Sequence, residues 1–230
     1  MRLATYNVEW FSSLFDDDSN LVVDDGLSGR RDVTRRQQIA ALGTVFQALD
    51  ADAVMVIEAP DQGRTRSSVN ALERFANRFD LRARKAVIGF SNGTQQEIAL
   101  MYDPDALTPH HDPREDPDAP MFDQVLGLDV DVDATADPIR FSKPPLELAV
   151  RTAAGSELRM IGVHAKSKAP HGARNAADAT RISIENRRKQ LAQCIWLRRR
   201  ILAHLKSSEP LIVLGDFNDG PGIDEYEQLF

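Results

Sequence analysis

The feature that most constrains this chain is a set of apolar, strand-length runs, each of which ends in a side chain able to bind a cation or a phosphate. The run RLATYN ends at Asn7, AVMVIE at Glu58 and MIGVH at His164, and LIVLGDFN carries Asp216 and Asn218. In α/β proteins, the ends of strands deliver ligand-binding residues to a shared crevice. The pattern therefore predicts that these distant side chains meet at one site.

Between these runs, helical and strand-like segments alternate. Apolar residues at helical spacing predict helices over 34–49, 67–79 and 180–205, with Thr34 as a candidate N-cap. We expect a turn at Asn92-Gly93 and the start of a further helix within 220–230. Strands are expected at 2–8, 53–57, 81–90, 97–102, 146–151, 158–163 and 210–214. Because several of these strands are joined as hairpins, mixed sheets are expected.

The composition is that of a globular protein. With 230 residues, 42% of them hydrophobic, the chain suits a single domain over 1–230 with a sizeable core. No run approaches the roughly 18 apolar residues of a membrane span, and the N-terminus does not read as a signal peptide. One cysteine, Cys194, excludes an internal disulfide framework. A cytoplasmic location is therefore expected, unless a leader has been removed.

Acidic residues are concentrated in two segments. Residues 103–138 hold eleven Asp or Glu and one basic residue, and 16–25 holds five Asp and no basic residue. We interpret 103–138 as an acidic loop insertion that is too polar and too often broken by proline to be a core element. Although the net charge is −7, the remainder is moderately basic and can bind a polyanion if the acidic loops face away.

Each polar residue at a strand end also has an ordinary interpretation. Asn or Asp after a strand is usually a turn former, and a lone histidine is usually a half-buried structural one. Together, however, carboxylate and amide oxygens suit Mg²⁺ or Mn²⁺. A histidine with Lys166 and Lys168 nearby suits phosphate oxygens. The set favours metal-assisted phosphoester cleavage over zinc proteolysis, which would need several His or Cys ligands.

Four segments, in this order, resemble the motifs of the endonuclease/exonuclease/phosphatase superfamily, which has the fold of exonuclease III and DNase I. They are TYNVEWF, ADAVMVIEAPD, IGVHAKSK and LIVLGDFND. The VH-x-KSK form, and RFSKPPLEL at 140–148, resemble its bacterial extracellular-nuclease-like branch. The resemblance implies a four-layer α/β sandwich of two packed mixed β-sheets flanked by helices.

The resemblance also implies a role for each residue at a strand end. Asn7 and Glu58 would hold the catalytic Mg²⁺ or Mn²⁺. His164 would hydrogen-bond a phosphate oxygen, and Asp216 would orient or deprotonate the attacking water. Asn218 would contact the phosphate and help to fix Asp216. These roles describe a metal-dependent hydrolase.

Three further residues and one absence complete the comparison with the superfamily. Lys166 and Lys168 are candidate substrate contacts, and Glu9 is a candidate at the rim. The superfamily pattern ends in a Ser-Asp-His-type motif, which does not occur before the last residue, Phe230. We therefore expect the chain to be C-terminally incomplete, with a sheet edge exposed to self-association, and to be inactive or severely impaired in isolation.

Nucleic acid is the expected substrate. The predicted helix over 181–206 carries eight Lys or Arg and could contact a phosphate backbone, although a solvated helix face is an equally good interpretation. A phosphatase or phosphodiesterase acting on a small or lipid phosphoester is the alternative, and a non-catalytic relative that binds phosphate-rich partners is another. No membrane partner is expected, since Trp10-Phe11 is the only exposed-looking aromatic pair. The sequence leaves the oligomeric state open.

Overall fold

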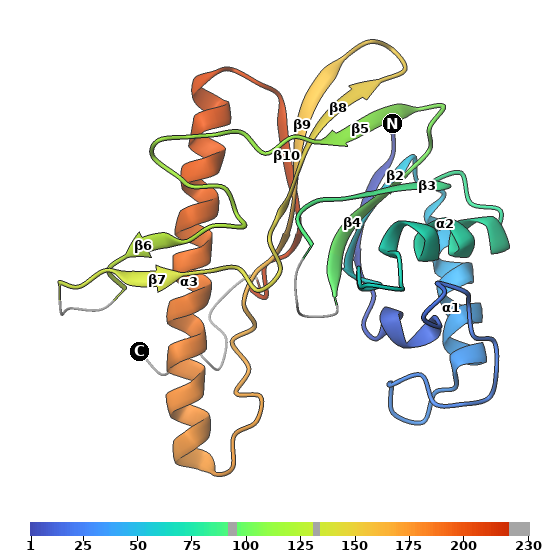
Figure 1. Ribbon diagram of the computed structural model, residues 1–230, viewed down its shortest axis with the longest axis horizontal. Coiled ribbons are helices and arrows are strands. Elements are labelled where there is room, and N and C mark those ends of the chain that lie inside the picture. The colour runs from blue at the N-terminus through green and yellow to red at the C-terminus, as the bar shows by residue number, and fades with distance from the viewer. Residues whose placement is uncertain (92–95, 131–133, 221–230) are drawn as a thin grey trace. The chain divides into compact units, whose positions relative to one another are not determined.

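The computed structural model describes residues 1–91, 96–130 and 134–220 (Figure 1). Contacts divide the chain into two compact units. The double-sheet unit comprises Met1–Pro113, Ser142–Val163 and Pro210–Gly215, and the long-helix unit comprises Arg114–Phe141, His164–Glu209 and the chain from Asp216 onward. The turn expected at Asn92-Gly93 and the helix expected after Gly220 lie outside the described residues.

The double-sheet unit is built on two mixed sheets, which agree with the expected arrangement (Figure 1). The first has the order β1-β2-β4-β3, with β1 and β2 parallel and the other pairs antiparallel. Its strands are β1 (Leu3–Asn7), β2 (Ala53–Ala59), β3 (Lys85–Ile88) and β4 (Glu97–Tyr102). The second has the order β10-β9-β8-β5. Its strands are β5 (Leu107–His111), β8 (Leu146–Thr152), β9 (Glu157–His164) and β10 (Leu211–Asp216).

Strand β2 is apolar along its length because both of its faces are covered. Val54 and Val56 belong to the core shared with α1 (Arg35–Leu49), α2 (Ser68–Arg78) and the short 3₁₀ helix η1 (Phe11–Leu14). Met55 and Ile57, which point the other way, belong to the core shared with β8 and β9 of the second sheet. Helices, first sheet and second sheet therefore form three packed layers, as a strand buried on both faces predicts.

Local capping explains where the helices begin. The Thr34 side chain accepts a hydrogen bond from the Gln37 amide, and the Gln37 side chain accepts one from the Thr34 amide, so the predicted N-cap of α1 is confirmed as a capping box. Ser67 caps α2 with one hydrogen bond, which its side chain accepts from the Asn70 amide. Helix α3 (Ala176–Lys206) begins four residues earlier than expected because Asn175 caps it, with a hydrogen bond of 2.9 Å from the Asp178 amide.

The segment 103–138 is not one loop, and this part of the expectation is wrong. It contains β5, which pairs with β8 at the edge of the second sheet, and its Leu107 is buried. Pro109 is tolerated there because an edge strand need not donate every backbone hydrogen bond. In the long-helix unit the same segment supplies the hairpin of β6 (Leu126–Leu128) and β7 (Asp137–Ile139). Alternating buried and exposed positions in β5 outweigh its polar composition.

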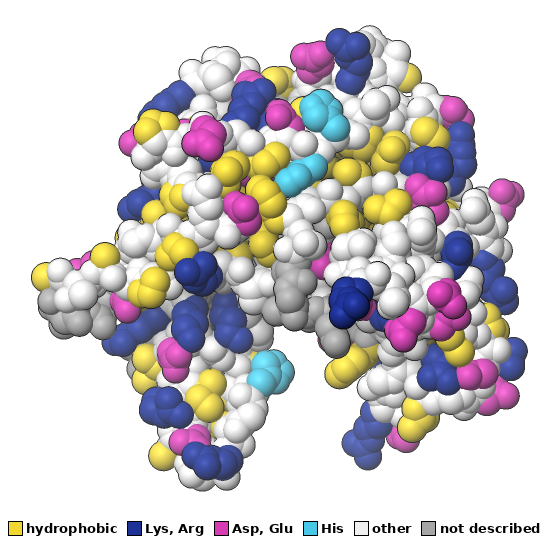
Figure 2. All heavy atoms as spheres, in the orientation of Figure 1, with side chains coloured by type: hydrophobic (Ala, Val, Ile, Leu, Met, Phe, Trp, Pro, Cys, Tyr) yellow, Lys and Arg dark blue, Asp and Glu magenta, His cyan; other side chains and the backbone are white. Residues whose placement is uncertain are grey.

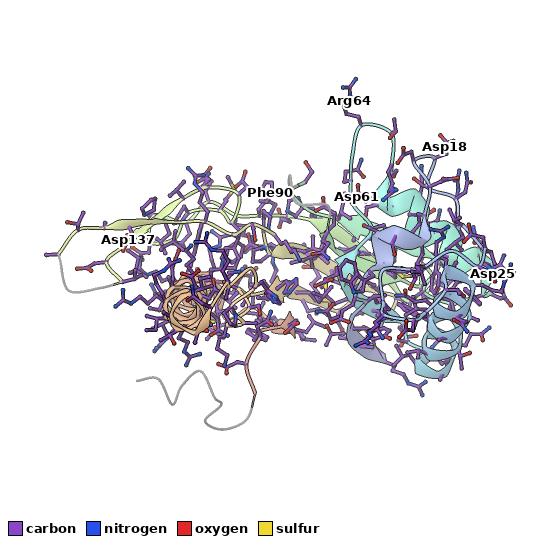
Figure 3. All side chains as sticks on the ribbon, turned by 90° about the horizontal axis from the view of Figure 1, so that it is seen from below. Asp18, Asp25, Asp61, Arg64, Phe90 and Asp137 are labelled. Atoms are coloured by element: carbon purple, nitrogen blue, oxygen red, sulfur yellow. The ribbon has the colours of Figure 1, made fainter. Side chains whose placement is uncertain are left out.

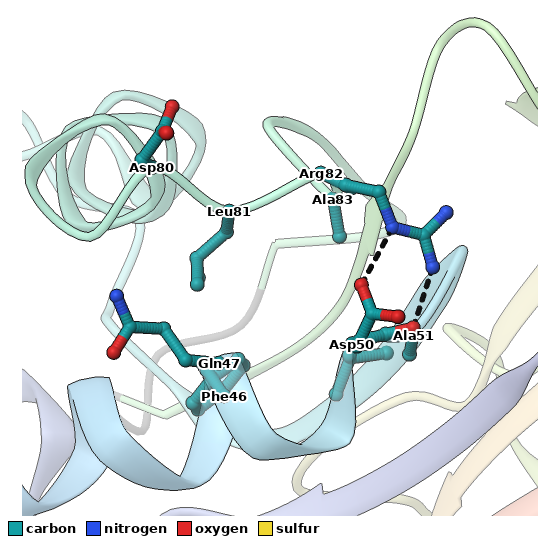
Figure 4. Close-up of a pocket in the computed structure, with 9 residues that line it drawn as sticks. Phe46, Gln47, Asp50, Ala51, Asp80, Leu81, Arg82 and Ala83 are labelled. Carbon is teal, nitrogen blue, oxygen red and sulfur yellow. Dashed lines mark hydrogen bonds and ion pairs between the residues drawn. The ribbon is translucent and has the colours of Figure 1, made fainter.

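A small cavity of about 100 Å³ lies between the end of α1 and the chain that enters β3 (Figure 4). Arg82 spans its rim, with Nε 2.7 Å from Asp50 Oδ1 and Nη1 2.5 Å from Asp52 Oδ1. The hydrogen bond from Arg82 lowers the pKa of Asp50, and hydrogen bonds from the Arg2 backbone amide and from Arg82 lower the pKa of Asp52. The charged groups around this cavity are thus engaged in joining α1, β2 and the entrance to β3.

The long-helix unit has its own aromatic core. Trp196 of α3 packs against Phe122 and Phe141, with ring centroids 5.7 and 5.4 Å away. Arg200, one turn later, is buried and donates to the carbonyl oxygens of Arg114 and Ala119. Among the described residues, no helix has the length and hydropathy needed to cross a membrane.

Glu209 links the end of α3, through His204, to the segment that begins at Arg114, and it makes the stability of this unit depend on pH. Burial alone would raise the pKa of Glu209, but hydrogen bonds from His204 (2.8 Å), Arg114 (2.6 Å) and Ser207 (3.1 Å) lower it to about 2. Because the unfolded value is 4.5, ionised Glu209 stabilises the fold above that pH, and the contribution is lost as the pH falls toward 2.

We expect Glu209→Gln to lower the free energy of unfolding near pH 6 by up to about 3 kcal/mol, and by little below pH 2. Urea unfolding of the wild type and the variant at several pH values measures this difference. Glu115→Gln, which changes an exposed glutamate of the same unit, is the matched control and should change the free energy of unfolding little at either pH. A Glu209→Gln effect that is independent of pH would argue against the ionic role.

Candidate active site

Asn7 and Glu58 lie at the same end of two neighbouring parallel strands of the double-sheet unit. Asn7 is in register with Ile57, and the Val8 amide donates to the Ile57 carbonyl oxygen at 2.9 Å. Glu58 directly follows Ile57 on β2. The two predicted metal ligands are therefore brought together, as strand-end placement predicts.

Glu58 is placed by a bulge in β2. The pairing of β2 with β4 shifts register between Ile57 and Ala59, and Glu58 has a left-handed φ of 61°. A bulge redirects a side chain out of the regular alternation, and a left-handed non-glycine residue costs about 1–2 kcal/mol. Such strain persists where surrounding contacts hold the residue in place, and it clusters at functional sites. The direction of the Glu58 carboxylate thus depends on an unfavourable backbone conformation at this bulge.

Two residues that the sequence did not identify hold the Glu58 carboxylate. Gln96 Nε2 donates to Glu58 Oε2 at 2.8 Å, and Lys143 Nζ lies 3.9 Å from Glu58 Oε1. Lys143 also donates to Gln96 Oε1, which orients the amide. Lys143 lies within the segment 140–148 noted above, which was the only sequence signal for it, and nothing marked Gln96. Gln96 and Lys143 therefore contact different oxygens of the Glu58 carboxylate.

The donor chemistry of this pair fits a hard divalent cation. Asn7 offers an amide oxygen and Glu58 a carboxylate, and Mg²⁺ is usually held by one or two carboxylates together with water and substrate phosphate. Among the described residues, no cluster of three or more His, Cys, Asp or Glu suits a metal ion. The pair thus suits a cation that relies on water and substrate for its remaining ligands.

His164, Asp216 and Asn218 lie together in the long-helix unit. Asp216 Oδ1 accepts a hydrogen bond from the Asn218 amide at 2.8 Å, and Asp216 Oδ2 is 3.9 Å from His164 Nε2. Asn218 Nδ2 donates to the Ala165 carbonyl oxygen at 2.9 Å, and the Ala165 amide donates to the Asp216 carbonyl oxygen at the same distance. The structure thus brings the three predicted catalytic residues into one cluster.

The turn that carries Asp216 and Asn218 follows from their side-chain chemistry. An aspartate that accepts a hydrogen bond from the amide two residues later forms an Asx turn. Asn218 has a left-handed φ of 51°, which asparagine adopts more readily than most residues. The turn directs one Asp216 oxygen to the backbone and the other toward His164.

Two buried glutamines of α3 form hydrogen bonds with the backbone of the two loops of this cluster. Gln190 Nε2 donates to the carbonyl oxygens of Phe217 at 2.8 Å and Asn218 at 2.9 Å. Gln193 Oε1 accepts from the Lys166 amide at 2.7 Å. The sequence did not identify them, because a glutamine on a helix that carries many charged residues gives no signal. Both loops of the cluster are thus anchored to one helix.

The structure gives the two candidate lysines different surroundings. Lys168 is only 4% exposed, and its Nζ donates to Asp219 Oδ1 at 2.8 Å, which lowers the pKa of Asp219. Arg187 Nη1 lies 3.5 Å from the other oxygen of Asp219. Lys166 is partly buried. The predicted substrate contact by Lys168 therefore competes with a contact that holds the Asp216–Asn218 turn.

Comparison with known families agrees with the motifs. A family model described as the endonuclease/exonuclease/phosphatase family matches residues 4–229, which include every candidate site residue. A search of curated proteins gives no match. The two mixed sheets with their helices have the DNase I-like architecture that the resemblance implied. The more specific assignment to a bacterial extracellular-nuclease-like branch stays a prediction.

The matched family covers nucleases and phosphatases, which hydrolyse phosphoesters and usually depend on a divalent metal ion. The match runs through both compact units and through both groups of candidate residues. The chain therefore belongs to the endonuclease/exonuclease/phosphatase family.

Proposed function

We propose that this protein is a divalent-metal-dependent nuclease that hydrolyses phosphodiester bonds by attack of water. The observation that carries the proposal is the cluster of His164, Asp216 and Asn218, which combines a proton acceptor (Asp216) with a donor suited to a phosphate oxygen (His164) and a residue that fixes the turn between them (Asn218). Family membership supports a phosphoester as the substrate. Hydrolysis needs a positioned water and donors on the non-bridging oxygens.

In this proposal, Asp216 orients the attacking water and takes its proton. Oδ1 accepts the hydrogen bond from the Asn218 backbone amide, and Oδ2 lies on the side of His164, where the water would be oriented. His164 donates a hydrogen bond to a phosphate oxygen, and Asn218 keeps the turn in place. Removing one donor of this kind typically costs about 10²–10³ in rate.

Asn7 and Glu58 would hold the divalent cation, Mg²⁺ or Mn²⁺. When bound, the cation neutralises charge that develops on the phosphate oxygens. Gln96 keeps the Glu58 carboxylate in one orientation through its 2.8 Å hydrogen bond. Lys143 places a positive charge 3.9 Å from the other oxygen of that carboxylate.

The basic residues of α3 support nucleic acid less strongly than their number suggests. Figure 2 shows many Lys and Arg side chains over the part of the molecule where Figure 1 draws α3. Arg200 is buried, Lys189 pairs with Glu185 at 2.6 Å, and Arg187 is engaged with Asp219. Within the described residues, Arg188, Arg198 and Arg199 form no ion pair. These three are the candidates for phosphate contacts on the helix.

A substrate panel tests this proposal and its alternatives. We would assay the protein on DNA, RNA, an inositol phosphate and bis(p-nitrophenyl) phosphate, with Mg²⁺, with Mn²⁺ and with EDTA. A nuclease should cleave nucleic acid only with metal, and its affinity for nucleic acid should fall steeply with salt. Cleavage of the two small phosphoesters alone would favour the phosphatase alternative. Salt-dependent binding of nucleic acid without turnover of any substrate would favour a non-catalytic role.

A further inference from the structure

Trp10 and its neighbour Phe11, which the sequence suggests as one exposed aromatic pair, have opposite environments. Phe11 is fully buried, whereas Trp10 is 51% exposed. Phe11 packs at 5.4 Å and 5.2 Å from the rings of Phe15 and Phe75, in the core beneath α2. The chain therefore turns between the two aromatic residues and leaves the indole at the surface of the double-sheet unit.

The backbone presents Trp10 in a strained conformation that side chains around it hold. Its φ of 64° and ψ of 22° are left-handed, at a cost of about 1–2 kcal/mol. Ser13 Oγ donates to the Trp10 carbonyl oxygen at 2.6 Å and to that of Ser28. Such strain, held by its surroundings, clusters at ligand contacts.

The indole packs against the backbone of Gly29. A Cβ on Gly29 would lie 3.0 Å from two ring carbons of Trp10, so the ring is in close contact with this backbone. Gly29 itself has a φ of +99°, which a side chain rarely adopts. Part of the ring is thus in contact with the protein, while half of the residue stays exposed. An aromatic ring that is supported on one side and exposed elsewhere is suited to stacking.

The segment around Trp10 is also tied to the body of the unit. Gln38 Nε2 donates to the Glu9 carbonyl oxygen at 2.8 Å, and Arg66 donates to the Ser12 carbonyl oxygen and to Asp61 Oδ1. Figure 3 labels Asp61, which also accepts from Ser12 Oγ at 3.0 Å. These contacts fix the loop on both sides of Trp10, so the loop has little conformational freedom to lose when a ligand binds.

Trp10 lies three residues after Asn7 along the chain. Three residues span at most about 11 Å, which limits the distance between the two Cα atoms. Even in a duplex, a strand advances about 3.4 Å per phosphate along the axis, so this distance is no more than about three nucleotides along a bound strand. A base near the proposed scissile phosphate is therefore within reach of the indole.

We propose that Trp10 is a stacking platform for an unpaired nucleobase of the substrate. The inference rests on the proposed nuclease function and specifies its substrate as single-stranded or locally opened nucleic acid. Stacking of a base on an aromatic side chain contributes about 5- to 150-fold in affinity and tolerates any base. The charges next to the ring balance, since Glu9 pairs with Arg30 at 2.9 Å. With no net positive charge next to the indole, an uncharged nucleobase is favoured as the ligand of Trp10 over the surface of an anionic membrane.

Tryptophan fluorescence tests the platform directly, because the only other tryptophan, Trp196, is fully buried. A single-stranded oligonucleotide, added in EDTA to prevent turnover, should quench the Trp10 emission saturably. Trp10→Phe supplies the emission of Trp196 alone. An oligonucleotide of the same length with abasic residues at every position carries the phosphates without the bases and should not quench.

Affinity measurements complete the test. Trp10→Ala should weaken oligonucleotide binding at least fivefold, Trp10→Phe should retain most of it, and Leu27→Ala, an exposed apolar residue of the same loop, should change nothing. Equal quenching by the abasic strand, or unchanged affinity in Trp10→Ala, would overturn the proposal. So would a blue shift of Trp10 with phosphatidylserine vesicles but no response to the oligonucleotide. Metal-dependent cleavage that is the same in wild type and Trp10→Ala refutes the platform alone, whereas the absence of any nucleic-acid cleavage by the wild type refutes the nuclease function.

Discussion

Replacing Asp216 with asparagine is expected to reduce metal-dependent phosphoester hydrolysis by about 10²–10⁴-fold, the usual contribution of a positioned general base. The amide oxygen of asparagine can still accept the Asn218 amide hydrogen bond, so the turn should keep its shape. The side chain can no longer take a proton from water. The rate of turnover and the melting temperature of the variant, each compared with the wild type, measure the two effects separately.

The control for this substitution is Asp123→Asn, an exposed aspartate of the same unit. It makes the same chemical change away from the cluster and should leave turnover unchanged. If Asp216→Asn retained activity within a few-fold of wild type at an unchanged melting temperature, Asp216 would not be the proton acceptor. The assignment of the cluster as catalytic would then need another base.

Replacing Gly215 with alanine is expected to destabilise the fold by at least about 3 kcal/mol, at the upper end of typical overpacking costs. Gly215 has a φ of +141°, and a Cβ there would overlap the Val163 carbonyl oxygen and lie 2.8 Å from the Val163 nitrogen. Both close atoms belong to the backbone of β9, which cannot rotate away. Strands β9 and β10 would have to separate.

For a chain of this size, such a loss should lower the melting temperature by roughly 6–12 °C. Gly127→Ala is the matched control, because a Cβ there meets only the Ala136 side chain at an ordinary 3.7 Å. Thermal unfolding of both variants measures the difference. A Gly215→Ala protein as stable as Gly127→Ala would show that the strands are not packed as closely as described.

Residues at the ends of strands could be predicted from the sequence because each one follows an apolar run. The run up to Ile57 marks β2, and the polar residue that follows the run is expected near the end of this strand. The same reasoning placed His164 at the end of β9 and Asp216 at the end of β10. Residues 216–218 also carry turn-forming side chains, so the local contact between Asp216 and Asn218 follows from their spacing.

Contacts made between distant segments could not be predicted in this way. The bulge at Glu58 arises from the register of β2 against β4, which no local pattern encodes. Gln96 and Lys143 meet Glu58 only after the sheets have formed. Gln190 reads as an ordinary polar residue of a helix until its loop partners are known. Supporting residues of this kind acquire their roles from tertiary structure.

The charge pattern of the sequence does not reveal which basic side chains are buried. Lys168 and Arg200 read as candidate phosphate contacts or solvated residues, yet both are buried. Lys168 pairs with Asp219, and Arg200 binds carbonyl oxygens of the segment before β6. Long basic side chains can satisfy their charge inside a protein when a carboxylate or several carbonyl groups are within reach. Sequence shows the charge but not the partner.

Binding of Mn²⁺ tests the proposed metal site most directly, because it does not depend on turnover. Titrations followed by electron paramagnetic resonance would compare the wild type, Glu58→Gln and the control Glu73→Gln, whose carboxylate pairs with Lys85 at 3.0 Å. The account predicts one Mn²⁺ bound by the wild type and by Glu73→Gln, with the affinity of Glu58→Gln at least about tenfold weaker. Equal Mn²⁺ affinity in all three proteins, or no binding by the wild type, would contradict it.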